Sequence, residues 1–214
     1  FDNTIVENYN NNKKEQGYNN NQLGYAVYLR PLQSGSFNIL RNTFSNNITD
    51  INIDNMTSTY KFSGEIKYNT FVFDTTQHTN SDGIRTPGAS IYVTGGSLHQ
   101  SRKVDIFNNN FIKFPNFEIL KNSYPTIGTA ILLHANYDII AENNWWGGVE
   151  ENKIPSMIID FNDNANQTGI VDYLPVLNNP DLAPPPMPPQ NFQLISQTAS
   201  TAKFKWDGIE INDL

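Results

Sequence analysis

The chain has 214 residues, a formal net charge of −7 and 16% charged residues. A surface for nucleic acid or an anionic membrane needs clustered positive charge, so this acidic balance argues against both partners. Cysteine is absent, which excludes a disulfide framework and a thiolate metal site. No apolar run approaches the roughly 18 residues of a membrane-spanning helix, and we expect any export signal to precede Phe1.

A motif of isoleucine, asparagine and an aromatic residue, in the spacing Ile-x-x-Asn-x-aromatic, recurs along the chain. Its copies are Ile39/Asn42/Phe44, Ile66/Asn69/Phe71, Ile106/Asn109/Phe111 and Ile140/Asn143/Trp145, with Asn3/Ile5 as a cut-off fifth copy. Internal repeats separated by about 20 to 50 residues are typical of solenoids. Each unit then buries its apolar face only against the next unit.

A stretch of alternating apolar residues precedes each of the four full copies, at 24–29, 50–53, 88–93 and 128–133. Alternation with period 2 predicts strands. We expect one column of side chains to point inward, made of Val27, Ile51, Ile91 and Ile131. The neighbouring outward column is expected to contain Tyr28, Asn52, Tyr92, Leu132 and Asp160. The polar segments between strands are interpreted as loops that project outward from the stack.

The motif residues predict a structural ladder inside the repeat. We expect the amides of Asn42, Asn69, Asn109 and Asn143 to stack at a sharp turn, about 4.8 Å apart along the axis. Phe44, Phe71, Phe111 and Trp145 would form an aromatic stack beside them, with Trp146 next to it. The alternative interpretation is a polar ladder that binds a ligand.

The segment 142–147 (ENNWWG), followed by 169–175 (GIVDYLP), resembles the terminal coil of the right-handed parallel β-helix proteins of the pectate-lyase-like superfamily. The resemblance covers residues 1–177. It implies an all-β solenoid of about five coils with long outward loops, closed at its apolar end by Trp145 and Trp146. That superfamily contains lyases, hydrolases, epimerases, phage tailspikes and non-catalytic adhesins, so the resemblance does not specify a function.

A short second unit is predicted after the β-helix. Residues 178–190 include the run PPPMPP at 184–189, which predicts a stiff linker. Residues 191–214 contain two alternating segments, around Phe192 and Trp206, and resemble the first strands of a fibronectin type III module. Because a sandwich of this kind needs about seven strands and about 100 residues, we expect a truncated module, a partial β-hairpin, and a chain that is a fragment at both ends.

The outward register also predicts a candidate binding face. Extending it by two residues adds Arg30, Asp54, Thr94, His134 and Asn162 in successive coils. With Tyr28, Asn52 and Tyr92, residues Arg30, Asp54 and His134 would form a polar, partly aromatic face suited to glycans. The alternative is a solvated sheet face that carries an Arg30–Asp54 ion pair.

The sequence supplies no catalytic constellation and no clear metal site. Glycoside hydrolysis needs two carboxylates about 5 to 9.5 Å apart, and the candidate face offers Asp54, with Asp160 several coils away. The pattern Asp160-x-Asn162-x-Asn164 resembles half of a Ca²⁺ loop, but Ala165 replaces the required glycine. We therefore predict no catalytic residue, no metal and no cofactor, with Ca²⁺ near Asp160 as the alternative.

These observations favour a non-catalytic extracellular or cell-surface β-helix that serves adhesion, matrix or glycan contact. Its expected partners are polysaccharides or other surface molecules, with self-association as a further option. One alternative is a polysaccharide-active lyase or glycoside hydrolase whose catalytic coils precede Phe1 or lie on the Tyr28/Asp54/His134 face. Another is a structural subunit of an extracellular filament or sheath.

Overall fold

The computed structural model describes residues 3–6, 25–30, 34–45, 47, 49–54, 62–73, 89–95, 103–112, 129–163, 169–184 and 190–207. Over these ranges the regular structure is almost entirely strand, with a 3-10 helix, η3, at Glu151–Met157. The chain is therefore all-β, as its period-2 patterns predict.

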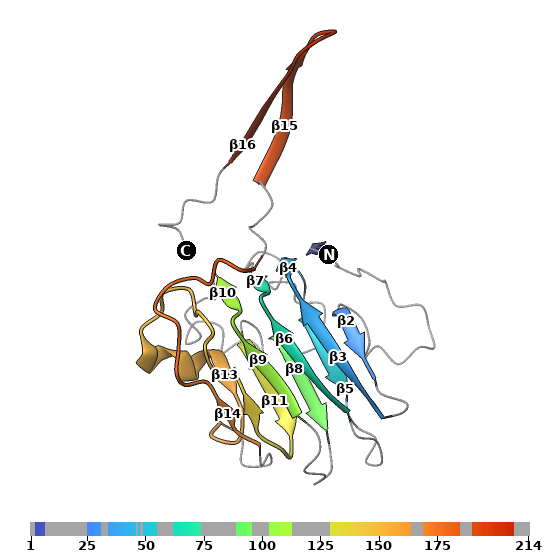
Figure 1. Cartoon of the computed structure of the whole chain (residues 1–214). Coiled ribbons are helices and arrows are strands. Elements are labelled where there is room, and N and C mark those ends of the chain that lie inside the picture. Colours follow the sequence, from blue (N-terminus) through green and yellow to red (C-terminus); the bar gives the residue numbers. More distant parts are fainter. Residues whose placement is uncertain are drawn as a thin grey trace, which may run out of the picture.

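Most strands pair in parallel within three sheets (Figure 1). Sheet A has the order β1 (Asn3–Val6), β4 (Asn42–Ser45), β7 (Thr70–Val72) and β10 (Asn110–Ile112). Sheet B has the order β13 (Ile158–Ile159), β11 (Thr129–Ala135), β8 (Ala89–Gly95), β5 (Thr49–Asp54) and β2 (Tyr25–Leu29). Sheet C has the order β14 (Val171–Asp172), β12 (Ile139–Ile140), β9 (Lys103–Phe107), β6 (Phe62–Lys67) and β3 (Gly35–Leu40).

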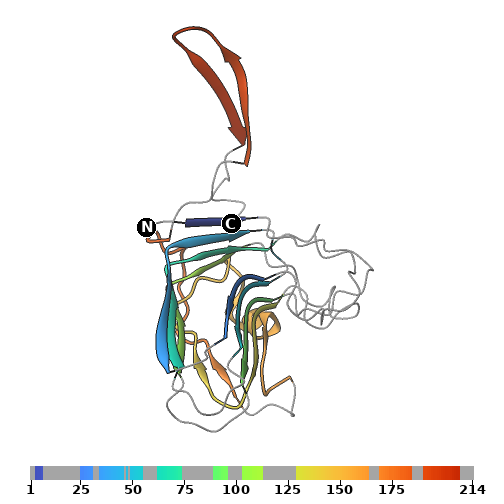
Figure 2. The same cartoon turned by 90° about the vertical axis from the view of Figure 1, so that its right-hand side faces the viewer.

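The chain visits sheets B, C and A in the same order each time, and one such passage is called a coil below. Coil 1 is β2, β3 and β4, coil 2 is β5, β6 and β7, and coil 3 is β8, β9 and β10. Coils 4 and 5 contribute β11–β12 and β13–β14, and reach sheet A through isolated bridges at Trp145 and Leu177. Figure 2 shows the three sheets around a shared interior. Stacked parallel sheets of this kind are compatible with a β-solenoid.

Inward-facing aliphatic side chains fill that interior at the predicted positions. Ile51 pairs in register with Ile91, and Ile91 with Ile131. All three are fully buried, whereas Val27, in the end strand β2, is half-buried. Burial of each such side chain contributes about 1.5 to 3 kcal/mol, so the stacked columns supply the main driving force for the arrangement.

A column of asparagine amides runs through the turns between sheets C and A. Asn42 Nδ2 donates to Asn69 Oδ1, Asn69 Nδ2 to Asn109 Oδ1, and Asn109 Nδ2 to Asn144 Oδ1, each at 3.0 Å. Each accepting Oδ1 also takes the backbone N–H of the asparagine one coil earlier, at 2.9 Å. The amides therefore satisfy buried backbone groups as well as one another.

The fourth member of the ladder is Asn144, so the prediction of Asn143 is wrong by one residue. Asn143 instead has the left-handed φ of 55° that Arg41, Tyr68 and Asn108 adopt immediately before the other ladder asparagines. The strand register agrees, because Ile140 pairs with Asp105 rather than with Ile106. At the cut-off copy, Asn3 pairs with Asn42 and Ile5 with Phe44, as predicted.

The aromatic stack follows the same one-residue correction. Phe44, Phe71 and Phe111 stack with ring centroids 5.1 Å apart, and the next ring, at 4.8 Å from Phe111, is Trp146 rather than Trp145. Tyr173 meets Trp146 edge-on at 6.5 Å. The stack therefore continues to the C-terminal end of the interior without a break.

Trp145 points to the opposite side of sheet A, away from the aromatic stack. It is 4% exposed and packs with Val72 and Ile112 against Leu177. Trp146 is 2% exposed and packs in the main core between the sheets. Both tryptophans are therefore buried, but in two different hydrophobic cores.

Residues 178–184, which the sequence assigns to a linker, contact the stacked sheets. Arg41 Nη1 donates to the carbonyl of Ala183 at 2.8 Å, and Asn110 exchanges two hydrogen bonds with the backbone of Asp181. Only the following proline run, at 185–189, lies outside the described residues. The first half of the predicted linker is thus part of the stacked structure.

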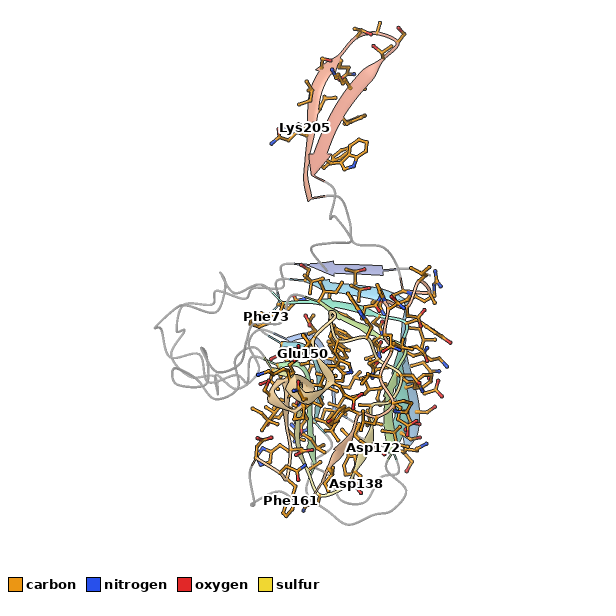
Figure 3. The ribbon with its side chains drawn as sticks, turned by 90° about the vertical axis from the view of Figure 1, so that its left-hand side faces the viewer. Phe73, Asp138, Glu150, Phe161, Asp172 and Lys205 are labelled. Atoms are coloured by element: carbon orange, nitrogen blue, oxygen red, sulfur yellow. The ribbon has the colours of Figure 1, made fainter. Side chains whose placement is uncertain are left out.

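The C-terminal strands β15 (Gln190–Gln197) and β16 (Ala202–Asp207) form an antiparallel hairpin that Figures 1 and 3 show projecting from the sheets, with Lys205 on it. Phe192 stacks with Phe204 at 4.9 Å and lies 6.4 Å from Trp206. These rings are between 44% and 58% exposed. An isolated two-stranded hairpin of this kind is marginally stable in water.

The ladder predicts a large effect for one buried amide. Asn69→Ala removes the acceptor for Asn42 and the donor to Asn109, Ile39 and Lys67, so we expect the free energy of unfolding to fall by about 3 kcal/mol or more. The matched control is Asn38→Ala, at an exposed position of β3, which should stay within about 0.5 kcal/mol of the parent. Denaturant melts measure both, and equal losses in the two variants would contradict the ladder's role.

Candidate functional site

The outer face of sheet B carries the predicted binding residues in aligned rows. The first row contains Tyr28, Asn52, Tyr92 and Leu132, which pair in register across coils 1 to 4. A second row, two residues further along each strand, contains Asp54, Thr94 and His134. Alternation in the strands places these side chains opposite the buried Ile51 and Ile53. The sequence-based register is therefore correct for these strands.

Asp54 is the centre of the polar contacts on this face. Its Oδ2 accepts a 2.5 Å hydrogen bond from the Tyr28 hydroxyl and lies 3.7 Å from Arg30 Nε. Thr94 Oγ1 is 3.4 Å from its other oxygen. The Asp54 side chain is 13% exposed and that of Arg30 is 48% exposed, so the guanidinium remains open to a ligand. The ion pair named as the alternative interpretation is present, and the Arg30 side chain is exposed beside it.

Tyr92 and His134 form a second contact on the same face. The Tyr92 hydroxyl lies 3.5 Å from His134 Nδ1. His134 is exposed, and Tyr28 is 36% exposed. The face thus offers an aromatic ring, an imidazole and a guanidinium to solvent, beside a carboxylate that they partly enclose.

Asn52 lies between the two tyrosines but is not an open binding group. It is 4% exposed, and its Oδ1 is a buried atom without a hydrogen-bond partner. Leaving a buried carbonyl unpaired costs about 1 to 3 kcal/mol. The sequence correctly predicts the row that Asn52 occupies, whereas its burial depends on packing that the strand pattern does not reveal.

Asp50 is a site residue that the sequence reasoning missed. It precedes Asn52 by two residues on the same outer face of β5 and is 3% exposed. Its carboxylate accepts hydrogen bonds from Asn47 Nδ2 at 2.9 Å and Ser90 Oγ at 2.6 Å. Burial raises the pKa of Asp50 to about 7, against the opposing effect of those two donors. The alternation that places Asp54 two residues after Asn52 on this face also places Asp50 two residues before it.

Asp160 is not part of the outward column, which corrects the sequence prediction. Leu132 pairs with Ile159 instead, and Asp160 is 3% exposed. Its two carboxylate oxygens accept backbone N–H groups of Asn162 and Val171 at 2.8 and 2.9 Å. The carboxylate therefore holds a turn, and the third residue of the proposed Ca²⁺ pattern, Asn164, lies outside the described residues.

The spacing of the carboxylates on sheet B does not match glycoside hydrolysis. Asp50 and Asp54 are four residues apart on one strand, which corresponds to about 13 Å. The two-carboxylate mechanism needs about 5 to 9.5 Å. Asp50 is in addition buried, so a glycosidic oxygen would not reach it on this face.

A closer carboxylate pair lies on sheet C, where Glu65 and Asp105 are direct neighbours in register. Lys67 Nζ is 2.5 Å from Glu65 Oε2, and Lys103 Nζ is 2.9 Å from Asp105 Oδ2. Each carboxylate thus has its own ammonium partner. This arrangement is typical of a surface ion-pair network, which offsets the repulsion between the two acids.

Within the described ranges, no group of three or more histidine, aspartate or glutamate side chains could hold a metal ion. The same part of the chain contains no helix long and apolar enough to cross a bilayer. Comparison of the chain with protein-family models, curated proteins and solved structures finds no match.

The buried carboxyl predicts a pH dependence of stability. Because the pKa of Asp50 rises from 3.8 to about 7 on folding, its protonated form is favoured in the folded state. The resulting contribution to the free energy of unfolding is fully present below about pH 4 and is lost as the pH rises through about 7. Its upper bound is about 4 kcal/mol, since each tenfold change in proton affinity corresponds to about 1.4 kcal/mol.

We expect Asp50→Asn to remove most of this decline, because an amide can accept from Asn47 and donate to Ser90 without ionising. Urea melts of the parent and the variant between pH 4 and 8 measure the difference, which isolates Asp50 from other titrating groups. If the free energy of unfolding declined equally with pH in the parent and in Asp50→Asn, the pH dependence would not come from Asp50.

Proposed function

We propose that the chain is part of a non-catalytic, right-handed parallel β-helix at the cell surface or outside the cell, whose sheet B face contacts glycans. Support for the β-helix comes from the parallel sheets, the amide ladder and the continuous aromatic stack. The resemblance of the segment 142–175 to a terminal coil of the pectate-lyase-like superfamily supports the same assignment.

One observation carries the proposed binding role. Tyr28 and Tyr92 lie in the same outward row of coils 1 and 3, two strand spacings apart, or about 9.6 Å. Aromatic faces on an extended, polar surface suit the apolar faces of sugar rings, while Asp54, Arg30 and His134 suit their hydroxyl groups. Polysaccharides or other glycan-bearing surface molecules are therefore the proposed partners.

The hairpin β15–β16 is proposed to be the start of a fibronectin type III-like module. Its antiparallel pairing and the ring cluster of Phe192, Phe204 and Trp206 on one face support this proposal. A sandwich of that type buries such a face against a second sheet. These rings are exposed here, and a completed module would bury them against its second sheet.

The competing proposal is a polysaccharide-cleaving enzyme, and the raised pKa of Asp50 is the observation that favours it. A general acid near neutral pH must touch its substrate, and Asp50 is 3% exposed. The carboxylate spacing of about 13 Å on β5 further favours binding over hydrolysis.

Affinity electrophoresis through neutral and acidic polysaccharides tests the binding role. We expect retardation that corresponds to a Kd of about 1 mM, or roughly 4 kcal/mol, and its loss in the double variant Tyr28→Ala/Tyr92→Ala. Tyr28→Phe should keep most of the retardation, because it preserves the ring. Phe192→Ala, which removes an exposed ring from the hairpin β15–β16, is the matched control.

Assays for reducing ends and unsaturated products, with and without Ca²⁺, test the enzyme alternative on the same polysaccharides. We expect no product. Turnover that disappears in Asp54→Asn or His134→Ala would replace the binding proposal with a catalytic one. Retardation that survives in the double tyrosine variant would show that the glycan contacts a different face.

A further inference from the structure

The segment 177–184, called the strap below, runs back along the stack from its C-terminal end. At Leu177 its backbone N–H donates to the carbonyl of Asn144 in coil 4, at 2.9 Å. By Asp181 it has reached coil 3, and by Ala183 it contacts Arg41 in coil 1. Seven residues thus cross from one end of the stack to the other.

The side-chain amide of Asn110 recognises the strap backbone at two points. Its Nδ2 donates to the carbonyl of Asp181 at 2.8 Å, and its Oδ1 accepts the N–H of the same residue at 2.9 Å. Asn110 is 6% exposed on the outer face of β10. A paired contact of this type fixes an extended segment in the way that a neighbouring strand would.

The Asp181 side chain adds sequence-specific contacts. Its Oδ2 accepts from Asn108 Nδ2 at 3.0 Å, and its Oδ1 accepts the N–H of Ala183 at 2.9 Å, which bends the strap toward Arg41. Arg41 and Asn108 are both left-handed turn residues that precede a ladder asparagine. The turns that place the ladder amides inward therefore also supply the docking groups on the outside.

Apolar burial contributes little to the middle of the strap. Leu182 is 91% exposed, whereas Pro184, at its end, is buried. Hydrogen bonds that involve a charged carboxylate or a guanidinium are stronger than those between neutral groups. Polar recognition by Asn108, Asn110 and Arg41 is thus what holds the strap in place.

We propose that the outer edge of coils 1 and 3 is a docking site for the strap, and that this docking delivers the chain to the N-terminal end of the stack. The module that begins at β15 then starts beside coil 1 and β1, rather than trailing from coil 5 where the sheets end. Figure 1 shows the hairpin on the sheet A side of the stack, the sheet that contains β1, β4 and β7. The site goes beyond the proposed glycan face, because it lies on sheet A and binds the chain's own segment.

A spin-label distance measurement tests the docking, because the chain contains no native cysteine that would react. The labels are placed at Leu182→Cys on the strap and Ser36→Cys on β3, two exposed positions. We expect one narrow distance distribution. Asp181→Ala removes the contacts of its carboxylate with Asn108 and with the Ala183 N–H, and should at least double the width. Asn110→Ala removes the paired contact with the Asp181 backbone and should do the same. The double variant should be at least as broad as the broader single variant, because the two substitutions remove different contacts of one segment.

Asn178→Ala, an exposed strap position, is the matched control and should leave the distribution narrow. Asp181→Ala changes no residue of the three sheets, so an unchanged thermal melt shows that the stack itself is intact. A broad distribution in the parent chain would overturn the proposal. A narrow one that persists in both Asp181→Ala and Asn110→Ala would overturn it equally.

Discussion

The side-chain amide column at the turn between sheets C and A is the interaction on which the rest of the structure depends. Each turn places a left-handed residue before a buried asparagine, and the amide then satisfies backbone groups that no strand pairing could reach. Because the Oδ1 atoms of Asn69, Asn109 and Asn144 each accept from the coil before them, the column sets the register of one coil on the next. The aromatic stack and the rows on sheet B follow from that register.

The sequence predicted this register where a single isoleucine precedes the turn, as it does before Asn42, Asn69 and Asn109. It failed in the last coil, where doubled Asn, Trp and Ile residues permit two alignments. Backbone φ decides between them, and no side-chain pattern encodes φ when the left-handed positions are Arg41, Tyr68, Asn108 and Asn143. The choice of Asn143 and Trp145 over Asn144 and Trp146 was wrong for that reason.

The outer face of sheet B shows which part of a site strand periodicity can predict. Alternation correctly identified the row that contains Tyr28, Asn52 and Tyr92, but burial depends on what packs over each position. Asn52 and Asp50 are therefore buried, while Tyr28 and Arg30 stay open. Likewise, the polar contacts of 178–184 join residues that are about 70 positions apart in the chain, which no local composition of a proline-rich segment can indicate.

The most direct test of the ladder is a comparison of two adjacent substitutions in coil 4. Asn144→Ala removes a buried amide whose Oδ1 accepts from Asn109, so the account predicts a loss of about 3 kcal/mol in unfolding free energy. Asn143→Gly should be nearly neutral, because glycine adopts the φ of 55° without strain. Denaturant unfolding of the two variants beside the parent measures both values. A large loss in Asn143→Gly together with an unchanged Asn144→Ala would contradict the account.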